Sequence, residues 1–499
     1  MNKMRLLLSA AAMLGVTAAG SEAARITDMT GNPNSPTGTG IVTDTSAFEE
    51  SGGSYTGGQG QETESMSPFS KPAPGTVNMR LNLEVNEYPT AAWWTGMNGN
   101  GTPAANAGNK QQAFGISGWV RLDFGIDGMS KNGVTYGAFT EIRENNTTAV
   151  TGSTTSATSG FAQSASADAG DNTLYVRQAF AYIGTDHLGI IRIGTGFAAD
   201  TLLEIGLNDD FDIGGWNFFT STTNIPSNIT PVWPWADDGG EYMAGRIAYL
   251  SPVIDGVDAE VAFAPNNSTP FDGSGCSAAY GGVGCATQSS STDAGDIGRY
   301  RNQVGIGLRY RNMFGPVGLA MSGIWTTSGK VNPGPFVSST GGVVGTGTPA
   351  ATASGTRYNG ENIGNVGAQI TFNHVLSIGG NVMWGAYNGN WGLQPVGGAT
   401  AIAWVAGVKY TFPRVPMTIG GSYFDYKYQG QAGLPTQRTS QGIDLGVTYG
   451  LGPGVVLVAE YAWGQNYQGD YDFLTGATGT SAGNKVQSQI ATAGISLRF

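Results

Sequence analysis

The chain has 499 residues, of which 80 are glycine, while only 12% are charged. This composition argues against a charge-rich disordered chain and is unlike that of a helix-rich enzyme. The formal net charge is -12. An acidic chain of this kind argues against a nucleic-acid partner, because neutralising a phosphate backbone requires clustered lysine and arginine side chains.

The first residues have the order of a secretory signal peptide. Lys3 and Arg5 precede an apolar run from Leu6 to about Gly20, and a small-x-small cleavage pattern ends at Ala23. We therefore predict a signal peptide over residues 1-23. The alternative is a short membrane anchor, but the apolar run is shorter than the ~20 residues of a spanning helix. No later stretch approaches that length, so we expect no transmembrane helix.

Residues 24-75 are rich in glycine, proline, serine and threonine and have no sustained hydrophobic period. Such a segment buries too little apolar surface to offset the entropy of ordering it. We expect a disordered extension, and we assign no chemistry to it.

The only two cysteines, Cys276 and Cys285, lie in the glycine-rich stretch GSGCSAAYGGVGCATQ. In an exported chain this arrangement predicts a structural disulfide. A metal site is the weaker alternative, because neither histidine is near in sequence and two thiolates do not complete a tetrahedral site. We expect no metal and no cofactor.

From residue 76 onwards the chain alternates apolar and polar residues with period two. In TVNMRLNLEVN, for example, Val77, Met79 and Leu81 alternate with Asn78 and Arg80. The same pattern returns in FGISGWVRLDFGID and RYRNQVGIGLRYR. It indicates β-strands with one apolar and one polar face, although a water-soluble sheet also alternates in this way.

The spacing of the strands is more informative than their alternation. Short turns such as DGMSKNG, TDHLG and GLGPG join pairs of strands, and much longer polar loops separate the pairs. An aromatic residue recurs near the end of each strand that enters a short turn. This asymmetry and a ring of interfacial aromatics are typical of an outer-membrane β-barrel. The expected ring consists of Phe124, Tyr182, Tyr249, Tyr310, Phe372, Tyr410 with Phe412, Tyr449 and Phe499.

Counted in this way, the strands number sixteen. An even number places both ends of the barrel on the periplasmic side, so that the first and last strands pair and every backbone polar group is satisfied. Sixteen strands also enclose a water-filled channel. We expect these strands at residues 76-87, 113-127, 133-143, 173-184, 189-196, 241-250, 257-264, 299-311, 317-327, 362-373, 375-387, 401-412, 417-428, 441-450, 455-464 and 486-499.

With these features the sequence resembles the Gram-negative general porin family over about residues 76-499. The resemblance lies in the strand-turn-strand segments YVRQAFAYIGTDHLGIIRIGTG and RIAYLSPVIDGVDAEVAFAP, and in the terminal Phe499. The family often has an arginine near the position of Thr195 and Gly196, and this chain has none there; Arg192 is the candidate replacement.

The resemblance implies that the third long loop, residues 197-240, folds into the barrel and narrows the pore. Carboxylates of this loop would then oppose arginines on the polar faces of the strands and create a transverse field. The expected acidic residues are Asp200, Glu204, Asp209, Asp210 and Asp212, with Asp237 and Asp238 later in the loop. The expected basic wall is Arg80, Arg121, Arg177, Arg246, Arg301 and Arg309.

Two alternatives remain for the acidic loop. Each carboxylate could simply be a solvated loop charge. The stretch NDDFDIGG also suggests a calcium loop, but Ile213 stands where such a loop needs glycine, and the distal glutamate is missing. For the arginines a lumen position is favoured, because on the lipid face each would cost roughly 2 to 4 kcal/mol at the midplane.

We predict an outer-membrane channel for the passive diffusion of ions and small hydrophilic solutes. A barrel enzyme is the first alternative, but the only histidines, His187 and His374, fall in short periplasmic turns and leave no general base at the other rim. A sugar-specific channel is the second, with stacking platforms among Trp93, Trp94, Trp216, Trp233, Trp235 and Trp391. A secreted adhesin is the third, and the regular aromatic ring disfavours it.

Family resemblance further implies a homotrimer in the outer membrane of a Gram-negative cell, in contact with outer-membrane lipid and lipopolysaccharide. It also implies that Phe499 is part of the signal recognised by the outer-membrane assembly machinery. The alternation places Leu497 and Phe499 on the lipid side of the last strand and Arg498 in the lumen.

Overall fold

The computed structural model describes residues 72–97, 113–145, 175–185, 187–196, 198–207, 225, 229–235, 245–266, 301–329, 358–373, 375–389, 392–452 and 454–498. Regular structure in these ranges consists of sixteen strands and one short helix, α3 (Ala199–Leu202). The first eight strands are β1 (Thr76–Trp94), β2 (Phe114–Met129), β3 (Thr135–Asn145), β4 (Tyr175–Thr185), β5 (Gly189–Thr195), β6 (Gly245–Leu250), β7 (Val257–Asn266) and β8 (Arg301–Phe314). The others are β9 (Val317–Thr327), β10 (Asn362–Phe372), β11 (Leu376–Gly385), β12 (Ala401–Thr411), β13 (Met417–Tyr428), β14 (Arg438–Gly452), β15 (Val455–Tyr467) and β16 (Lys485–Arg498).

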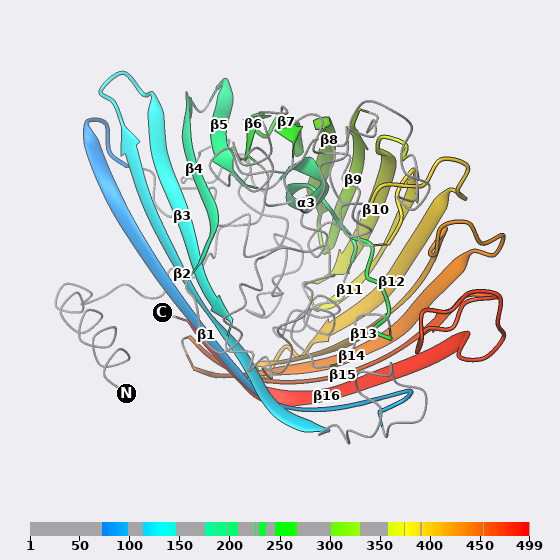
Figure 1. Cartoon of the computed structure of the whole chain (residues 1–499). Coiled ribbons are helices and arrows are strands. Elements are labelled where there is room, and N and C mark those ends of the chain that lie inside the picture. Colours follow the sequence, from blue (N-terminus) through cyan, green and yellow to red (C-terminus); the bar gives the residue numbers. More distant parts are fainter. Residues whose placement is uncertain are drawn as a thin grey trace.

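The strands form one closed antiparallel barrel in which each strand pairs with its neighbours in sequence, and β1 pairs with β16 (Figure 1). At this seam Thr90 lies opposite Thr492, and their hydroxyl oxygens are 3.1 Å apart. The sequence prediction of a sixteen-stranded closed barrel is confirmed. In the described part of the chain, none of the helices is long and apolar enough to cross a membrane.

The two faces of the barrel wall differ in the way that alternation requires. On β10, Val366 and Ile370 point outward and are exposed, whereas Asn365 and Gln369 point inward and are buried. Large apolar side chains therefore cover the outside, where a hydrocarbon solvent stabilises them, and polar side chains line the inside. This distribution is the reverse of that in a water-soluble barrel.

Charged side chains are not spread evenly over the inner wall. Strands β1 to β8 carry most of those whose side chains are described, including Arg121, Glu141, Arg192, Arg246, Asp258, Glu260, Arg309 and Arg311. On β9 to β14, the described inward-facing side chains include only Lys409, Asp444 and Arg438 as charged groups, and many other positions are glycine, alanine or serine. Strands β1 to β8 therefore form the charged half of the wall, whereas β9 to β14 are lined largely by small residues.

Several other strand ends shift by a few residues, and two differences from the sequence prediction concern the lumen face. Strand β1 continues to Trp94 instead of ending at residue 87, because Tyr88 and Ala92 extend the inward row with apolar side chains that the polar pattern did not anticipate. Tyr182, expected in the aromatic ring, faces the lumen, where its hydroxyl donates to Asp127. On the neighbouring strand, Tyr136 is the exposed outward aromatic.

Candidate functional site in the barrel lumen

The chain leaves β5 and turns into the barrel, where α3 lies against β7, β8 and β9 (Figure 1). All four residues of this helix are buried. It approaches β8 at Gly307, where a Cβ atom would lie 2.8 Å from Leu203 Cδ1 and 2.9 Å from Ala199 Cβ. Both separations are shorter than van der Waals contact, so the helix can occupy this position only because residue 307 has no side chain.

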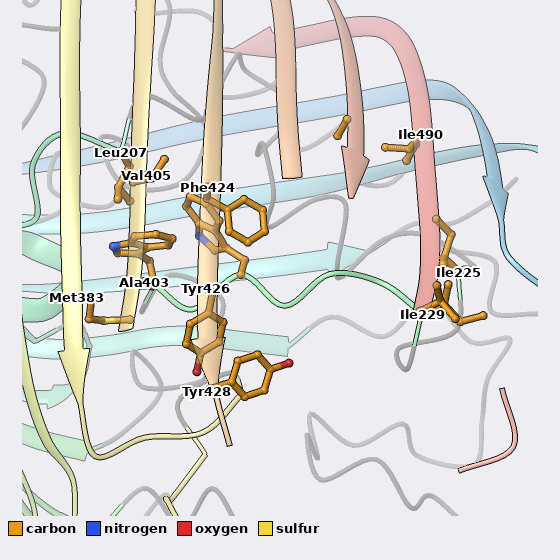
Figure 2. Close-up of a cluster of buried hydrophobic side chains, with 14 of the residues drawn as sticks. Leu207, Ile225, Ile229, Met383, Ala403, Val405, Phe424, Tyr426, Tyr428 and Ile490 are labelled. Carbon is orange, nitrogen blue, oxygen red and sulfur yellow. The ribbon is translucent and has the colours of Figure 1, made fainter. Parts of the chain in front are cut away.

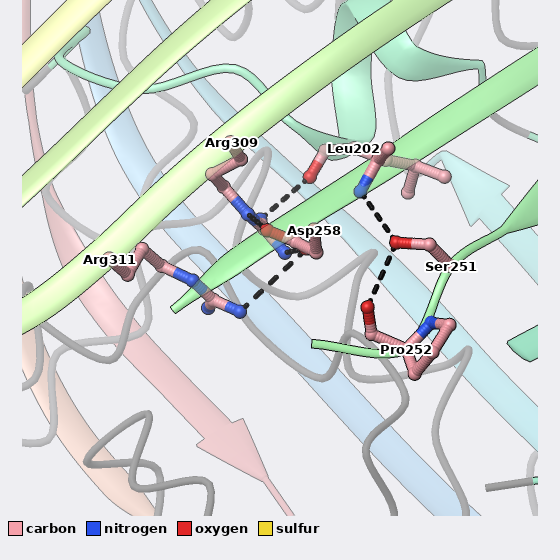
Figure 3. A network of polar contacts seen from close by, with 7 residues as sticks. Leu202, Ser251, Pro252, Asp258, Arg309 and Arg311 are labelled. Carbon is pink, nitrogen blue, oxygen red and sulfur yellow. Dashed lines mark hydrogen bonds and ion pairs between the residues drawn. The ribbon is translucent and has the colours of Figure 1, made fainter. Parts of the chain in front are cut away.

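Arg309 joins the helix to the charged half of the wall (Figure 3). Its Nη2 and Nε atoms lie 2.7 and 3.2 Å from the two carboxylate oxygens of Asp258 on β7. Its Nη1 atom donates to the carbonyl oxygen of Leu202 at 3.0 Å. The guanidinium thus binds a carboxylate in the bidentate manner and also satisfies a carbonyl group at the helix C-terminus. Arg311 lies farther from the same carboxylate, at 3.9 Å.

Asp200 faces Arg246 on β6 and is 2% exposed. Neither of its carboxylate oxygens makes a hydrogen bond of good geometry with the described residues. Burial raises the pKa of the Asp200 carboxyl above its ordinary value, while the charge of Arg246 and the backbone N–H groups of Asp200 and Thr201 lower it. Burial is the largest of these effects, so the ionised form is disfavoured at this position.

Beyond α3 the segment crosses β10 and β11, where Asn381 holds it. The Asn381 side chain donates to the carbonyl oxygen of Ile205 at 3.0 Å and to Asn365 Oδ1 at 2.9 Å. Asn365 in turn donates to the Glu204 carboxylate. Gly367 lies beneath this contact, and a Cβ atom there would overlap the Ile205 carbonyl oxygen. The segment therefore rests directly on the backbone of the wall.

The returning part of the same loop, residues 229–235, also reaches Asn381. Trp235 Nε1 donates to Asn381 Oδ1 at 2.8 Å. The Trp233 ring packs edge-on against Phe424 of β13, with 5.2 Å between centroids and an interplanar angle of 89°. One asparagine side chain thus binds both arms of the loop.

The first residues of this arm contact β15. Asn466 Nδ2 donates to the carbonyl oxygen of Thr230 at 2.8 Å and to that of Ile229 at 3.3 Å. Pro231 packs on Gly464, where a Cβ atom would lie 3.0 Å from Pro231 Cβ. The loop therefore spans the lumen from the charged wall at β7 and β8 to the opposite wall at β15.

An apolar cluster inside the barrel includes residues of both the loop and the wall (Figure 2). The inward residues of β13 form a row, with the rings of Tyr426 and Tyr428 stacked at a centroid distance of 4.2 Å and an interplanar angle of 14°. Ile225, Ile229 and Ile490 of β16 belong to the same cluster. The sequence prediction missed this cluster, because strand alternation alone assigns apolar residues to the lipid face.

The predicted site residues divide into two groups. Among the acidic ones, Asp200 and Glu204 lie in the lumen against the wall, and Asp209, Asp210 and Asp212 lie outside the described residues.

Among the arginines, the structure does not describe the side chains of Arg80, Arg177 and Arg301. The other predicted residues Cys276, Cys285, Phe499 and His374 also lie outside the described residues. Arg121, Arg246 and Arg309 face the lumen and are buried. Arg121 lies 3.3 Å from Glu141, and Arg192, the candidate replacement on β5, lies 3.8 Å from Glu260. Strand carboxylates, which the prediction did not consider, therefore pair with part of the basic wall.

Of the six tryptophans considered as sugar platforms, four are described, and Trp94 is one of the buried residues of the lumen cluster. Trp233 and Trp235 are 0% exposed and are packed together, with 4.3 Å between ring centroids. Trp93 points outward, away from the lumen. Trp216 and Trp391 lie outside the described residues. Trp233 and Trp235 anchor the loop to the wall and offer no free face to a sugar ring.

Known proteins resemble this chain in sequence pattern and in fold. The sequence model of the family described as Gram-negative porin matches residues 76–469. Among solved structures, an anion-selective porin from Comamonas acidovorans aligns with a TM-score of 0.50 and 14% identity, over 85% of this chain and 100% of that one. An engineered variant of the Rh. blastica porin aligns with a TM-score of 0.44 and 13% identity over the same shares. A comparison with curated protein sequences gives no match.

Proposed function

This chain belongs to the Gram-negative porin family, and we propose that it is a general diffusion channel narrowed by its own residues 197–240. Members of this family reside in the outer membrane, and the chain is an outer-membrane channel. Ions and small hydrophilic solutes would cross through the lumen without a chemical step.

The observation that carries the proposal is the attachment of both arms of this loop at Asn381. Ile205 binds it from the outgoing arm and Trp235 from the returning arm. A loop held at both ends by buried hydrogen bonds and by an apolar cluster is a fixed constriction, since displacing it would leave buried polar groups unpaired. Fixed constrictions select solutes by size and charge, as a general porin does.

We expect the constriction to carry positive charge on the barrel wall and negative charge on the loop. Arg246 and Arg309 lie on the wall that faces the loop. We expect Asp209, Asp210 and Asp212, which follow Leu207 in sequence, to contribute negative charge to the opposite side of the pore. Such opposed charges would orient dipolar solutes and disfavour apolar ones.

The same proposal includes the processing and assembly of the chain. We expect removal of residues 1-23, a Cys276–Cys285 disulfide, a homotrimer, contact with lipopolysaccharide, and recognition of Phe499 by the outer-membrane assembly machinery. The family supports these expectations by analogy. Non-reducing mass spectrometry tests the cleavage and the disulfide, and native gel electrophoresis of protein extracted from outer membranes tests the homotrimer.

Planar-bilayer recording tests the channel itself. The purified protein should give stepwise conductance increments, with an ohmic current and a solute flux that rises linearly with concentration. Saturating flux and current block by one sugar would favour the substrate-specific channel instead. Absence of any conductance, with hydrolysis of phospholipid or peptide, would contradict the channel and favour an enzyme.

A further inference from the structure

Arg438 lies at the rim of the barrel opposite the short turns, at the first residue of β14. It pairs in register with Tyr428, whose side chain faces inward. The Arg438 side chain is therefore on the lumen side of the wall, near the mouth formed by the long loops.

Three aromatic rings surround its guanidinium group. The Cζ atom lies 4.7 Å from the ring centroid of Tyr471 and 4.7 Å from that of Phe473. Tyr428 is third, at 6.0 Å. Contacts of this length are favourable cation–π interactions, and together they restrict the orientation of the guanidinium plane.

One edge of the guanidinium is also fixed by a hydrogen bond. Arg438 Nε donates to Gln468 Oε1 at 3.0 Å. The amide nitrogen of Gln468 donates in turn to the carbonyl oxygens of Gln429 and Thr436, at 3.0 and 2.9 Å. The side chain that holds Arg438 is therefore itself held by the neighbouring loop.

The other edge of the guanidinium carries N–H groups that donate no hydrogen bond to the described residues. Among the described residues, the Arg438 Nη1 and Nη2 atoms have no hydrogen-bond acceptor, and neither atom is buried without a partner. The carboxylate of Asp472, adjacent to Phe473 in sequence, accepts from Leu474 N and Thr475 Oγ1, each at 2.8 Å. That carboxylate accepts hydrogen bonds within its own turn and forms no ion pair with Arg438.

We propose that Arg438 is a binding site for small oxyanions, carboxylates or phosphates, at the mouth of the channel. A planar fork with a fixed orientation and two free nitrogen atoms matches the two oxygens of such an anion. The site would raise the local concentration of anionic solutes before they reach the constriction. This inference depends on the proposed diffusion channel and adds a solute class to it.

The test measures block of chloride current by inorganic phosphate in bilayers free of lipopolysaccharide. Wild type should show saturable block. Arg438→Gln should raise the half-blocking phosphate concentration about tenfold, as expected for a lost charge-assisted hydrogen-bonded pair. Arg438→Lys keeps the charge and the cation–π contacts but lacks the fork, so it should give an intermediate value. Arg414→Gln removes one positive charge from an exposed turn at the other rim and should behave as wild type.

A second arm adds lipopolysaccharide to the bilayer. Block that persists assigns the site to dissolved anions, and block that disappears only when this lipid is present assigns it to lipid phosphate; both place an oxyanion at Arg438. Equal half-blocking concentrations in wild type and Arg438→Gln, or no block of a conducting wild type, would overturn the inference. A wild type without any conductance would instead contradict the diffusion channel.

Discussion

Replacing Gly367 with alanine should lift the constricting loop from the wall of the barrel. The new Cβ atom would overlap the carbonyl oxygen of Ile205 and would lie 2.8 Å from the side-chain nitrogen of Asn381. Backbone atoms occupy the other side of this contact, so no rotamer change relieves it. The loop must move away, and the hydrogen bond from Asn381 to Ile205, 3.0 Å long, must lengthen or break.

The cost can be bounded from these two contacts. Overpacking a well-packed site costs about 1–3 kcal/mol, and a lost intramolecular hydrogen bond costs about 1 kcal/mol. Their sum, about 2–4 kcal/mol, corresponds to a shift of roughly 30- to 700-fold in the equilibrium between the seated and the displaced loop. The barrel itself should persist, because Gly367 keeps its backbone pairing with Asn381 and Ser322.

Single-channel recording is the assay. Wild type should give one narrow conductance level per pore, and the Gly367→Ala channel should give a broader distribution with additional levels. Gly305→Ala is the matched control: Gly305 also faces the lumen beneath the same segment, but a Cβ there would have only ordinary contacts, 3.8 Å from Thr326 Oγ1 and 3.9 Å from Ala198 Cβ. If Gly367→Ala and Gly305→Ala share one conductance distribution, the loop is not seated on the wall as described.

Three further predictions address the charge, stability and assembly of the protein. Neutralising Asp209, Asp210 and Asp212 together should shift the reversal potential in a salt gradient away from cation preference; an unchanged potential would remove this stretch from the constriction. Because burial raises the pKa of Asp200 in the folded protein, its stabilising contribution is present below the unfolded value of about 3.9 and is lost as pH rises through the folded value. Asp200→Asn should therefore raise the thermal midpoint in detergent at neutral pH and flatten its dependence on pH, and a slope equal to that of wild type would contradict this account. Deleting Phe499 should lower the yield of assembled protein more than the conductance of the channels that do form; normal yield would argue against its role as an assembly signal.

The number of strands and the side of the wall on which each side chain lies could be predicted from the sequence, because one side of the wall meets lipid and the other meets water. Val366 and Ile370 must face hydrocarbon, and Asn365 and Gln369 must not, so period two alone places them. The short turns then give the order of the strands and the closure of the barrel.

The constriction could be predicted only in part. Its loop is recognisable by position in the sequence. The contacts that hold the loop against the wall join residues far apart in sequence, such as Trp235 and Asn381, which are 146 positions apart. The pairing of Arg309 with Asp258 was hidden for the same reason: a long loop separates β7 from β8, and its length does not reveal their register. Phe424 and Tyr426 alternate just as lipid-facing residues do, so only the neighbouring strands reveal that they point inward.

The seam between β1 and β16 also determines how the chain can fold. Thr90 and Thr492, whose hydroxyls meet there, are 402 residues apart in sequence, so this ladder has the greatest loop-closure entropy of the barrel. Contacts of such long range form slowly. Until they form, β1 has one edge with unpaired backbone groups, which can pair with any other extended chain. Refolding in detergent should therefore end in a slow closure step, and the protein should be most prone to aggregate just before that step.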